Sequence, residues 1–100
     1  MLNIDLVKQG SEGELIMSGE LNASTAAEAE AIINDAVSRF DRLILNMGRL
    51  EYVSSAGLRI LKRANFNLRR KGGTLLLKNV NKTVMEVLEL TGFAAILKFI

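Results

Sequence analysis

The stretch that decides the fold is Tyr52-Val53-Ser54-Ser55-Ala56-Gly57-Leu58-Arg59, where an apolar run gives way to a helical pattern. From Leu58 onward, apolar residues recur at the spacing of one helix face, and Gly72-Gly73 supplies a stop signal. Serine is a common N-cap because its oxygen accepts a bond from an otherwise unpaired backbone N–H. We therefore expect Ser54 and Ser55 to lie exposed at a helix N-terminus, which favours an anion. A plain capping role is the alternative.

Two strands and a helix are predicted before this stretch. Leu2, Ile4 and Leu6 alternate with polar residues, which predicts a strand with one buried face. Turn residues at 9–13 and a second short strand at 14–19 complete an antiparallel hairpin. A helix follows residues 21–24, and Thr25 and Glu28 have the spacing of a capping box. Its apolar stripe is made of Ala29, Ile32, Ile33, Ala36, Val37 and Phe40.

Alternating strands and helices make up the rest of the chain. The apolar run at 43–45 predicts a central strand over 42–47, covered on both faces, and residues 74–77 predict another buried strand. A third helix opens at 79–81, with a capping-box spacing at Thr83 and Glu86, and ends at Gly92. Residues 95–100 read as a last short strand. The order β-β-α-β-α-β-α-β predicts an α/β fold whose mixed sheet has parallel pairs, right-handed crossovers and helices packed on it.

Composition limits the classes of function. One hundred residues, 49% of them hydrophobic, suit a single globular domain over residues 1–100. No apolar run approaches the ~20 residues that span a bilayer, and the first residues lack the layout of a signal peptide. The absence of Cys suits the cytoplasm. Without His or Cys, a Ser-His-Asp triad and the usual zinc sites are excluded, so we expect no enzyme, no metal and no cofactor.

Charge is distributed unevenly along the chain. Residues 1–51 carry four basic and nine acidic side chains, whereas residues 52–78 carry seven basic and no acidic ones. Such a segment can mark a nucleic-acid or membrane patch. It can equally be a solvated helix face whose last turn, Arg69-Arg70-Lys71, complements the helix dipole. We favour the second interpretation because the net charge is only +2 and the chain lacks Trp, so no direct nucleic-acid binding is expected.

Four short motifs in a fixed order give the chain a family resemblance. They are Gly19-Glu20-Leu21-Asn22-Ala23, Leu43-Ile44-Leu45-Asn46, Tyr52-Val53-Ser54-Ser55-Ala56-Gly57-Leu58 and Leu90-Thr91-Gly92-Phe93. With them, nearly all 100 residues resemble the STAS-domain anti-sigma factor antagonists. The resemblance implies a single STAS-like domain that is switched by serine phosphorylation.

The resemblance also implies which residues form the site. The family's central motif reads Asp-Ser-Ser/Ala-Gly-Leu, and the serine after the Asp accepts the phosphate. That position falls on Ser55, while Ser54 stands at the Asp position and Asn22 stands where many members carry Asp. The implied partner-binding residues are Asn22, Ala23, Ser24, Tyr52, Ser54, Ser55, Ala56, Gly57 and Arg59.

The function implied is that of a partner switch, which we expect to be a cytoplasmic monomer. The unmodified protein binds a serine kinase that is also an anti-sigma factor, and so releases the sigma factor. Phosphorylation of Ser55 breaks the contact, and a serine phosphatase restores it, without nucleic acid or membrane taking part. One alternative is an interaction module of a transporter or a lipid-trafficking complex, without the switch. A nucleotide-binding protein or enzyme is disfavoured because the sequence has no Gly-rich phosphate loop.

Overall fold

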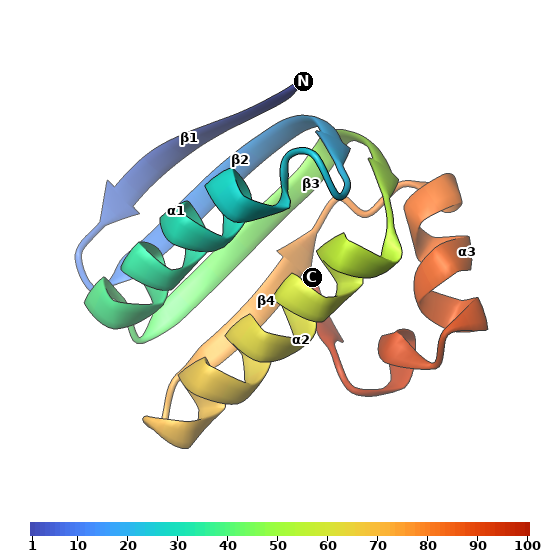
Figure 1. Ribbon diagram of the computed structural model, residues 1–100. Helices are drawn as coiled ribbons and strands as arrows, with labels where there is room; N and C mark the ends of the chain where they lie inside the picture. The colour runs from blue at the N-terminus through green and yellow to red at the C-terminus, as the bar shows by residue number, and fades with distance from the viewer.

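The strands of the protein lie side by side in chain order. The computed structural model describes all 100 residues and contains one five-stranded sheet with three α-helices (Figure 1). The strands are β1 (Leu2–Gln9), β2 (Glu12–Leu21), β3 (Arg42–Val53), β4 (Thr74–Lys78) and β5 (Lys98–Phe99). β1 pairs with β2 in antiparallel fashion, and every later neighbour is parallel. The predicted fold class and element order are confirmed.

The first two helices, α1 (Ala26–Arg39) and α2 (Ser55–Arg70), lie side by side over one face of the sheet (Figure 1). Each belongs to a crossover that advances one strand in the same direction, and right-handed crossovers then place both helices on one face. The core lies between these layers. Leu15, Leu45 and Leu77 form a row in register across β2, β3 and β4, and each is at most 1% exposed.

The third helix, α3 (Lys82–Leu90), lies near the C-terminal end of β3, and a 3-10 turn (Phe93–Ala95) leads from it to β5 (Figure 1). No helix combines the length and the apolar character needed to cross a bilayer. The strand predicted over 95–100 is shorter in the structure, because only Lys98 and Phe99 pair with β4.

β3 is twice as long as the strand predicted over 42–47. Beyond Met47 it stays paired with β2, through Gly19 with Leu50 and Leu21 with Val53, although the register shifts twice. These shifts disturb the alternation of buried and exposed residues, which hid the second half of the strand from the sequence pattern. As a result β3 ends one residue before Ser54 and leads directly into α2.

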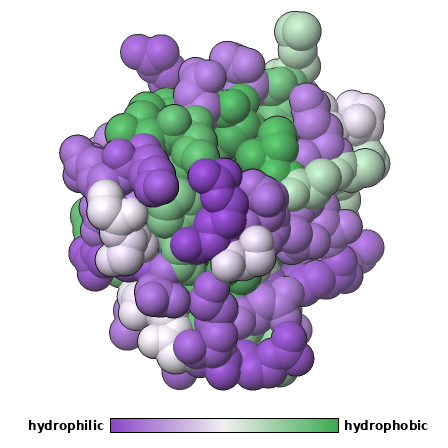
Figure 2. Space-filling view, turned by 90° about the vertical axis from the view of Figure 1, so that its left-hand side faces the viewer, coloured by the Kyte–Doolittle hydropathy of each residue, from purple (hydrophilic) through white to green (hydrophobic).

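The predicted buried face of the first strand is only partly formed. Leu2 is buried, Ile4 is half-buried, and Leu6 is 40% exposed. The reason is that β1 is an edge strand with a neighbour on one side alone. Val7 is exposed on the same strand, and Figure 2 shows apolar surface on this side of the molecule.

Neither predicted capping box is present. The hydroxyl of Thr25 donates to the Glu20 carbonyl instead of capping α1. α3 is capped by Asn81, whose Oδ1 accepts from the Val84 N–H at 2.9 Å while its Nδ2 donates to the Leu50 carbonyl at 2.6 Å. One side chain thus caps α3 and ties it to β3.

Asn81→Ala is expected to lower the free energy of unfolding by about 2 kcal/mol, because the helix loses its cap and the carbonyl of buried Leu50 loses a donor. Urea denaturation measures the change. Thr83→Ala is the matched control, since Thr83 is exposed and should change stability by less than about 0.5 kcal/mol. Equal losses for both variants would contradict the assigned cap.

Candidate functional site

Ser55 is the first residue of α2 and is exposed, as expected from the sequence. The backbone N–H of Ser54 donates to the Leu21 carbonyl at 2.9 Å, which fixes the start of the helix against the end of β2. The first helical bond follows, from the Leu58 N–H to the Ser54 carbonyl at 2.9 Å. The Ser55 hydroxyl therefore stands at a helix N-terminus, where the free N–H groups and the macrodipole favour negative charge.

Ser54 does not match the expectation that both serines are exposed. It is half-buried at the N-cap position of α2, and its Oγ is buried without a hydrogen-bond partner. The bond from its N–H to Leu21 holds the residue against the end of β2, so its side chain does not reach the surface as that of Ser55 does. The two adjacent hydroxyls are thus in different environments, and only Ser55 is placed for a reaction at the surface.

Ser54→Ala is expected to leave the free energy of unfolding unchanged or to raise it by up to about 1 kcal/mol. Replacing a capping serine with alanine normally lowers the free energy of unfolding by about 1 kcal/mol. Here the hydroxyl makes no capping bond, and its removal relieves an unpaired buried polar atom. Urea denaturation gives the sign, and a loss of about 1 kcal/mol or more would show that the hydroxyl does cap the helix.

The loop before α1 is shaped by its own side chains. The Oδ1 of Asn22 accepts from the Ser24 N–H at 3.0 Å and from the Ser24 hydroxyl at 2.8 Å. The Asn22 N–H in turn donates to the Thr25 hydroxyl at 3.0 Å. Asn22 is half-buried as a result, while Ala23 and Ser24 are exposed at the tip of the loop.

A shallow cavity of ≈ 320 Å³ joins this loop to the start of α2. It brings together Ala23, Ala56 and Arg59, three of the residues expected at the partner surface. The sequence analysis missed the remaining lining residues, which are Ala26, Ala27, Glu30, Ile60 and Arg63. Arg63 could have been predicted, because it follows Arg59 by four residues and so lies on the same helix face. The other lining residues could not, because nothing in the sequence indicated that α1 packs against α2.

The other six expected partner-binding residues do not line this cavity; they are Asn22, Ser24, Tyr52, Ser54, Ser55 and Gly57. Tyr52 is 47% exposed near the end of β3 and does not line it. Gly57 is buried beneath the surface, where an added Cβ would come within 2.7 Å of Leu21 Cγ and 2.9 Å of Val53 Cγ1. Gly57 therefore allows the first turn of α2 to approach β2 and β3 closely.

The charges around Ser55 suit an added anion. Arg59 follows one turn later on the same face of α2 and has no carboxylate within 4.0 Å, whereas Arg63 is paired with Glu30. The first turn of α2 contains no acidic residue. A phosphate on Ser55 would therefore meet the helix dipole and a free guanidinium, with no carboxylate in that turn to repel it.

A family model described as "STAS domain" matches residues 3–100. The chain is 38% identical over 88 residues to BtrV of Bordetella bronchiseptica, which is provisionally named an anti-sigma factor antagonist, and the match covers 85% of this chain and 76% of BtrV.

Two solved structures have the same fold. SpoIIAA, the Bacillus cell fate determinant in the phosphorylated form, aligns with a TM-score of 0.76 at 20% identity, covering 98% of this chain and 91% of SpoIIAA. A sulfate transporter family protein from Wolinella succinogenes aligns with a TM-score of 0.78 at 20% identity, covering 93% of this chain and 80% of the transporter family protein. At such identities the likeness concerns the fold, and it is the family model and BtrV that decide membership. The chain belongs to the STAS-domain family of anti-sigma factor antagonists.

Proposed function

We propose that this protein is an anti-sigma factor antagonist controlled by phosphorylation at Ser55. In the unmodified state it binds a serine kinase that is also an anti-sigma factor, so that the sigma factor is released. The kinase phosphorylates Ser55 and the contact breaks, and a serine phosphatase restores the binding form. The protein acts by binding and carries out no chemistry of its own.

The observation that carries the proposal is the position of Ser55. Its exposed hydroxyl lies at the N-terminus of α2, beside a cavity to which Ala23, Ala56 and Arg59 all contribute. A partner that covers the cavity must approach this hydroxyl. The name of BtrV supports the antagonist role, and the phosphorylated form of SpoIIAA shows that the same fold can carry a phosphate.

The chemistry of a phosphate explains how the contact would break. A phosphate adds about −1.5 to −2 charges and three acceptor oxygens. The fold tolerates this charge because the helix N-terminus and Arg59 offset it. A partner surface that is apolar or acidic where it meets Ser55 would instead have to desolvate the phosphate or face like charge. Modification therefore weakens docking and leaves the domain folded.

Affinity purification from the native cells tests the proposal. Tagged wild-type protein should retain a serine kinase and lose it when ATP is added, and mass spectrometry should find the phosphate on Ser55. Ser55→Ala should retain the same kinase with or without ATP, and Ser54→Ala should behave like the wild type. Phosphate on Ser54 or Ser24 would remove Ser55 from the role. Membrane transport proteins as the retained partners, unaffected by ATP, would favour the module without a switch.

A further inference from the structure

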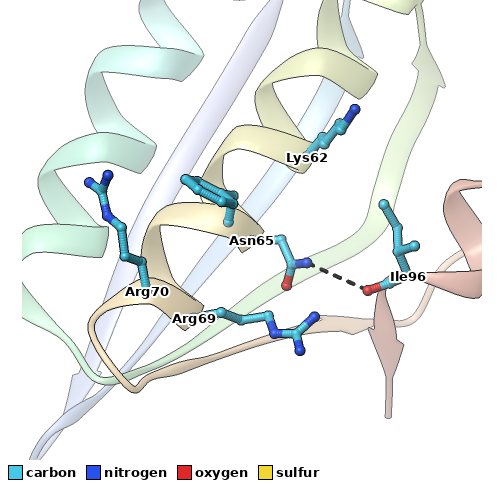
Figure 3. A pocket seen from close by; sticks show the side chains of 6 residues that line it. Lys62, Asn65, Arg69, Arg70 and Ile96 are labelled. Atoms are coloured by element: carbon cyan, nitrogen blue, oxygen red, sulfur yellow. Dashed lines mark hydrogen bonds between the residues drawn. The ribbon is translucent and has the colours of Figure 1, made fainter.

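The exposed face of α2 carries several cations that form no ion pair within the protein. Lys62, Arg69 and Arg70 have no carboxylate within 4.0 Å, and α2 itself contains no acidic residue. These three side chains line a cavity of ≈ 510 Å³ in the C-terminal half of the helix. We call it the α2 groove, and its other lining residues are Asn65, Phe66 and Ile96 (Figure 3).

The α2 groove combines these cations with exposed apolar side chains. Phe66 is 62% exposed and Ile96 is 45% exposed, although the protein has a well-filled core elsewhere. The Arg70 guanidinium lies 5.6 Å from the centre of the Phe66 ring, so the aromatic face is already oriented by a cation. Apolar contact and positive charge are therefore available within the same cavity.

The walls of the α2 groove come from two parts of the chain. Asn65 is only 8% exposed, and its Nδ2 donates to the Ile96 carbonyl at 3.5 Å (Figure 3). This contact links α2 to the residue that follows the 3-10 turn, on the way to β5. This contact fixes Asn65 and Ile96 relative to each other, so this part of the lining is in place before a partner binds, which lowers the entropy cost.

We propose that the α2 groove binds an acidic segment of a protein partner that inserts one large apolar side chain. Carboxylates of the segment pair with Lys62, Arg69 and Arg70, while the inserted side chain contacts Phe66 and Ile96. Arginine pairs with a carboxylate more specifically than lysine does, because its planar guanidinium donates two parallel hydrogen bonds to the two carboxylate oxygens. Aromatic residues, phenylalanine among them, and arginine are also enriched at protein interfaces.

The shape of the groove favours a protein segment over other polyanions. The groove is open, but its lining comes from both α2 and Ile96, so one inserted side chain of a protein segment can contact both parts, whereas a flat bilayer surface meets mainly the exposed cations. Single-stranded nucleic acid is bound by a series of aromatic residues, and Phe66 is the one aromatic residue of the groove.

The α2 groove is separate from the Ser55 site but accessible to the same partner. Phe66 follows Ser55 by about three helical turns, which places it on nearly the same face of α2 and about 16 Å along the axis. A protein interface of ordinary size spans that distance. Binding in the groove does not depend on phosphorylation of Ser55, so the proposal stands or falls separately from the proposed function.

A short fluorescein-labelled peptide with a central Phe between runs of Glu serves as the probe. Fluorescence anisotropy should show saturable binding to the full chain, with Arg69→Glu and Phe66→Ala each weakening it about tenfold or more. Lys8→Glu is the matched control, because Lys8 is exposed on β1 and the change in net charge is the same as in Arg69→Glu. Lys8→Glu should bind within about twofold of the wild type, and Ser55→Ala should bind like the wild type whatever its effect on the switch.

Several results would overturn the proposal. Absence of binding at millimolar peptide is one, and an equal loss in Lys8→Glu and Arg69→Glu is another, because net charge alone would then explain the binding. A peptide with Ser in place of Phe that binds equally well would remove the apolar contact. Tighter binding of phosphatidylserine vesicles or duplex DNA, lost in Arg69→Glu, would assign the groove to a membrane or a nucleic acid.

Discussion

Ser55→Asp is expected to weaken binding of the protein partner about a hundredfold, which corresponds to about 2.7 kcal/mol. The substitution puts a permanent negative charge beside the cavity lined by Ala23, Ala56 and Arg59, where the partner is proposed to dock. Like charge or an unpaired charge at an interface costs several kcal/mol. The same charge lies in the first turn of α2, so the free energy of unfolding should rise by about 0.3–1 kcal/mol. Titration calorimetry with the recovered kinase measures the first effect, and urea denaturation measures the second.

Two controls separate the position of the charge from its presence. Thr83→Asp adds the same charge to an exposed residue in the first turn of α3, and its affinity for the partner should stay within about threefold of the wild type. Ser55→Ala removes the hydroxyl without adding charge and should also bind normally. If Ser55→Asp binds as tightly as Ser55→Ala, the proposed switching mechanism is wrong.

Gly57→Val is expected to lower the free energy of unfolding by about 3 kcal/mol. An added Cβ at this position lies 2.7 Å from Leu21 Cγ and 3.0 Å from the Leu21 carbonyl oxygen. The second neighbour is backbone of β2, which cannot move aside without shifting the sheet, and overpacking of this kind costs about 1–3 kcal/mol or more. Valine gains only a few tenths of a kcal/mol of helix propensity over glycine, which is too little to hide the clash. Urea denaturation at constant m-value measures the loss.

Gly10→Asn provides the comparison for Gly57→Val. Gly10 has a positive φ of 61°, yet nothing lies within 4 Å of an added Cβ, and asparagine tolerates the left-handed region. This variant should lose less than about 1 kcal/mol. A loss for Gly57→Val that is no larger would mean that α2 can move away from β2 and β3 at little cost.

The fold could be predicted because hydrophobic periodicity and turn residues agree along most of the chain. The run Leu43-Ile44-Leu45 indicated a strand buried on both faces, and Gly72-Gly73 marked the end of α2 within two residues. Which strands pair with each other was harder to predict from the sequence. The second half of β3 is held in the sheet by β2 through a shifted register, and a local pattern carries no record of such a partner.

The caps show a similar limit. Thr-x-x-Glu spacing is necessary for a capping box, but the Thr25 hydroxyl accepts from the Asn22 N–H and donates to the Glu20 carbonyl, so it is engaged with the preceding loop. Asn81 is the cap that forms, because its Nδ2 also reaches the Leu50 carbonyl of β3. In both cases a contact outside the helix decided how a side chain with several local options was used.

The candidate site was predicted in part. The sequence predicted Ser55 at a helix start, and the structure adds that the Oγ of the adjacent Ser54 is buried, which the local pattern does not indicate. The structure also shows that Ala23, at the tip of the loop, and the start of α2 line the same cavity. This follows from the packing of α1 against α2, which the amphipathic stripes allow but do not specify.

The strand order has a consequence for how the protein forms during synthesis. Each strand pairs with the one made immediately before it, so the sheet can grow at one edge as the chain leaves the ribosome. No early strand has to wait for a distant one, so each loop closure spans a single connection between neighbouring strands. The residues of the first hairpin and of the β2-α1-β3 unit are all synthesised before Ser55, so the N-terminus of α2 can pack on strands that have already formed.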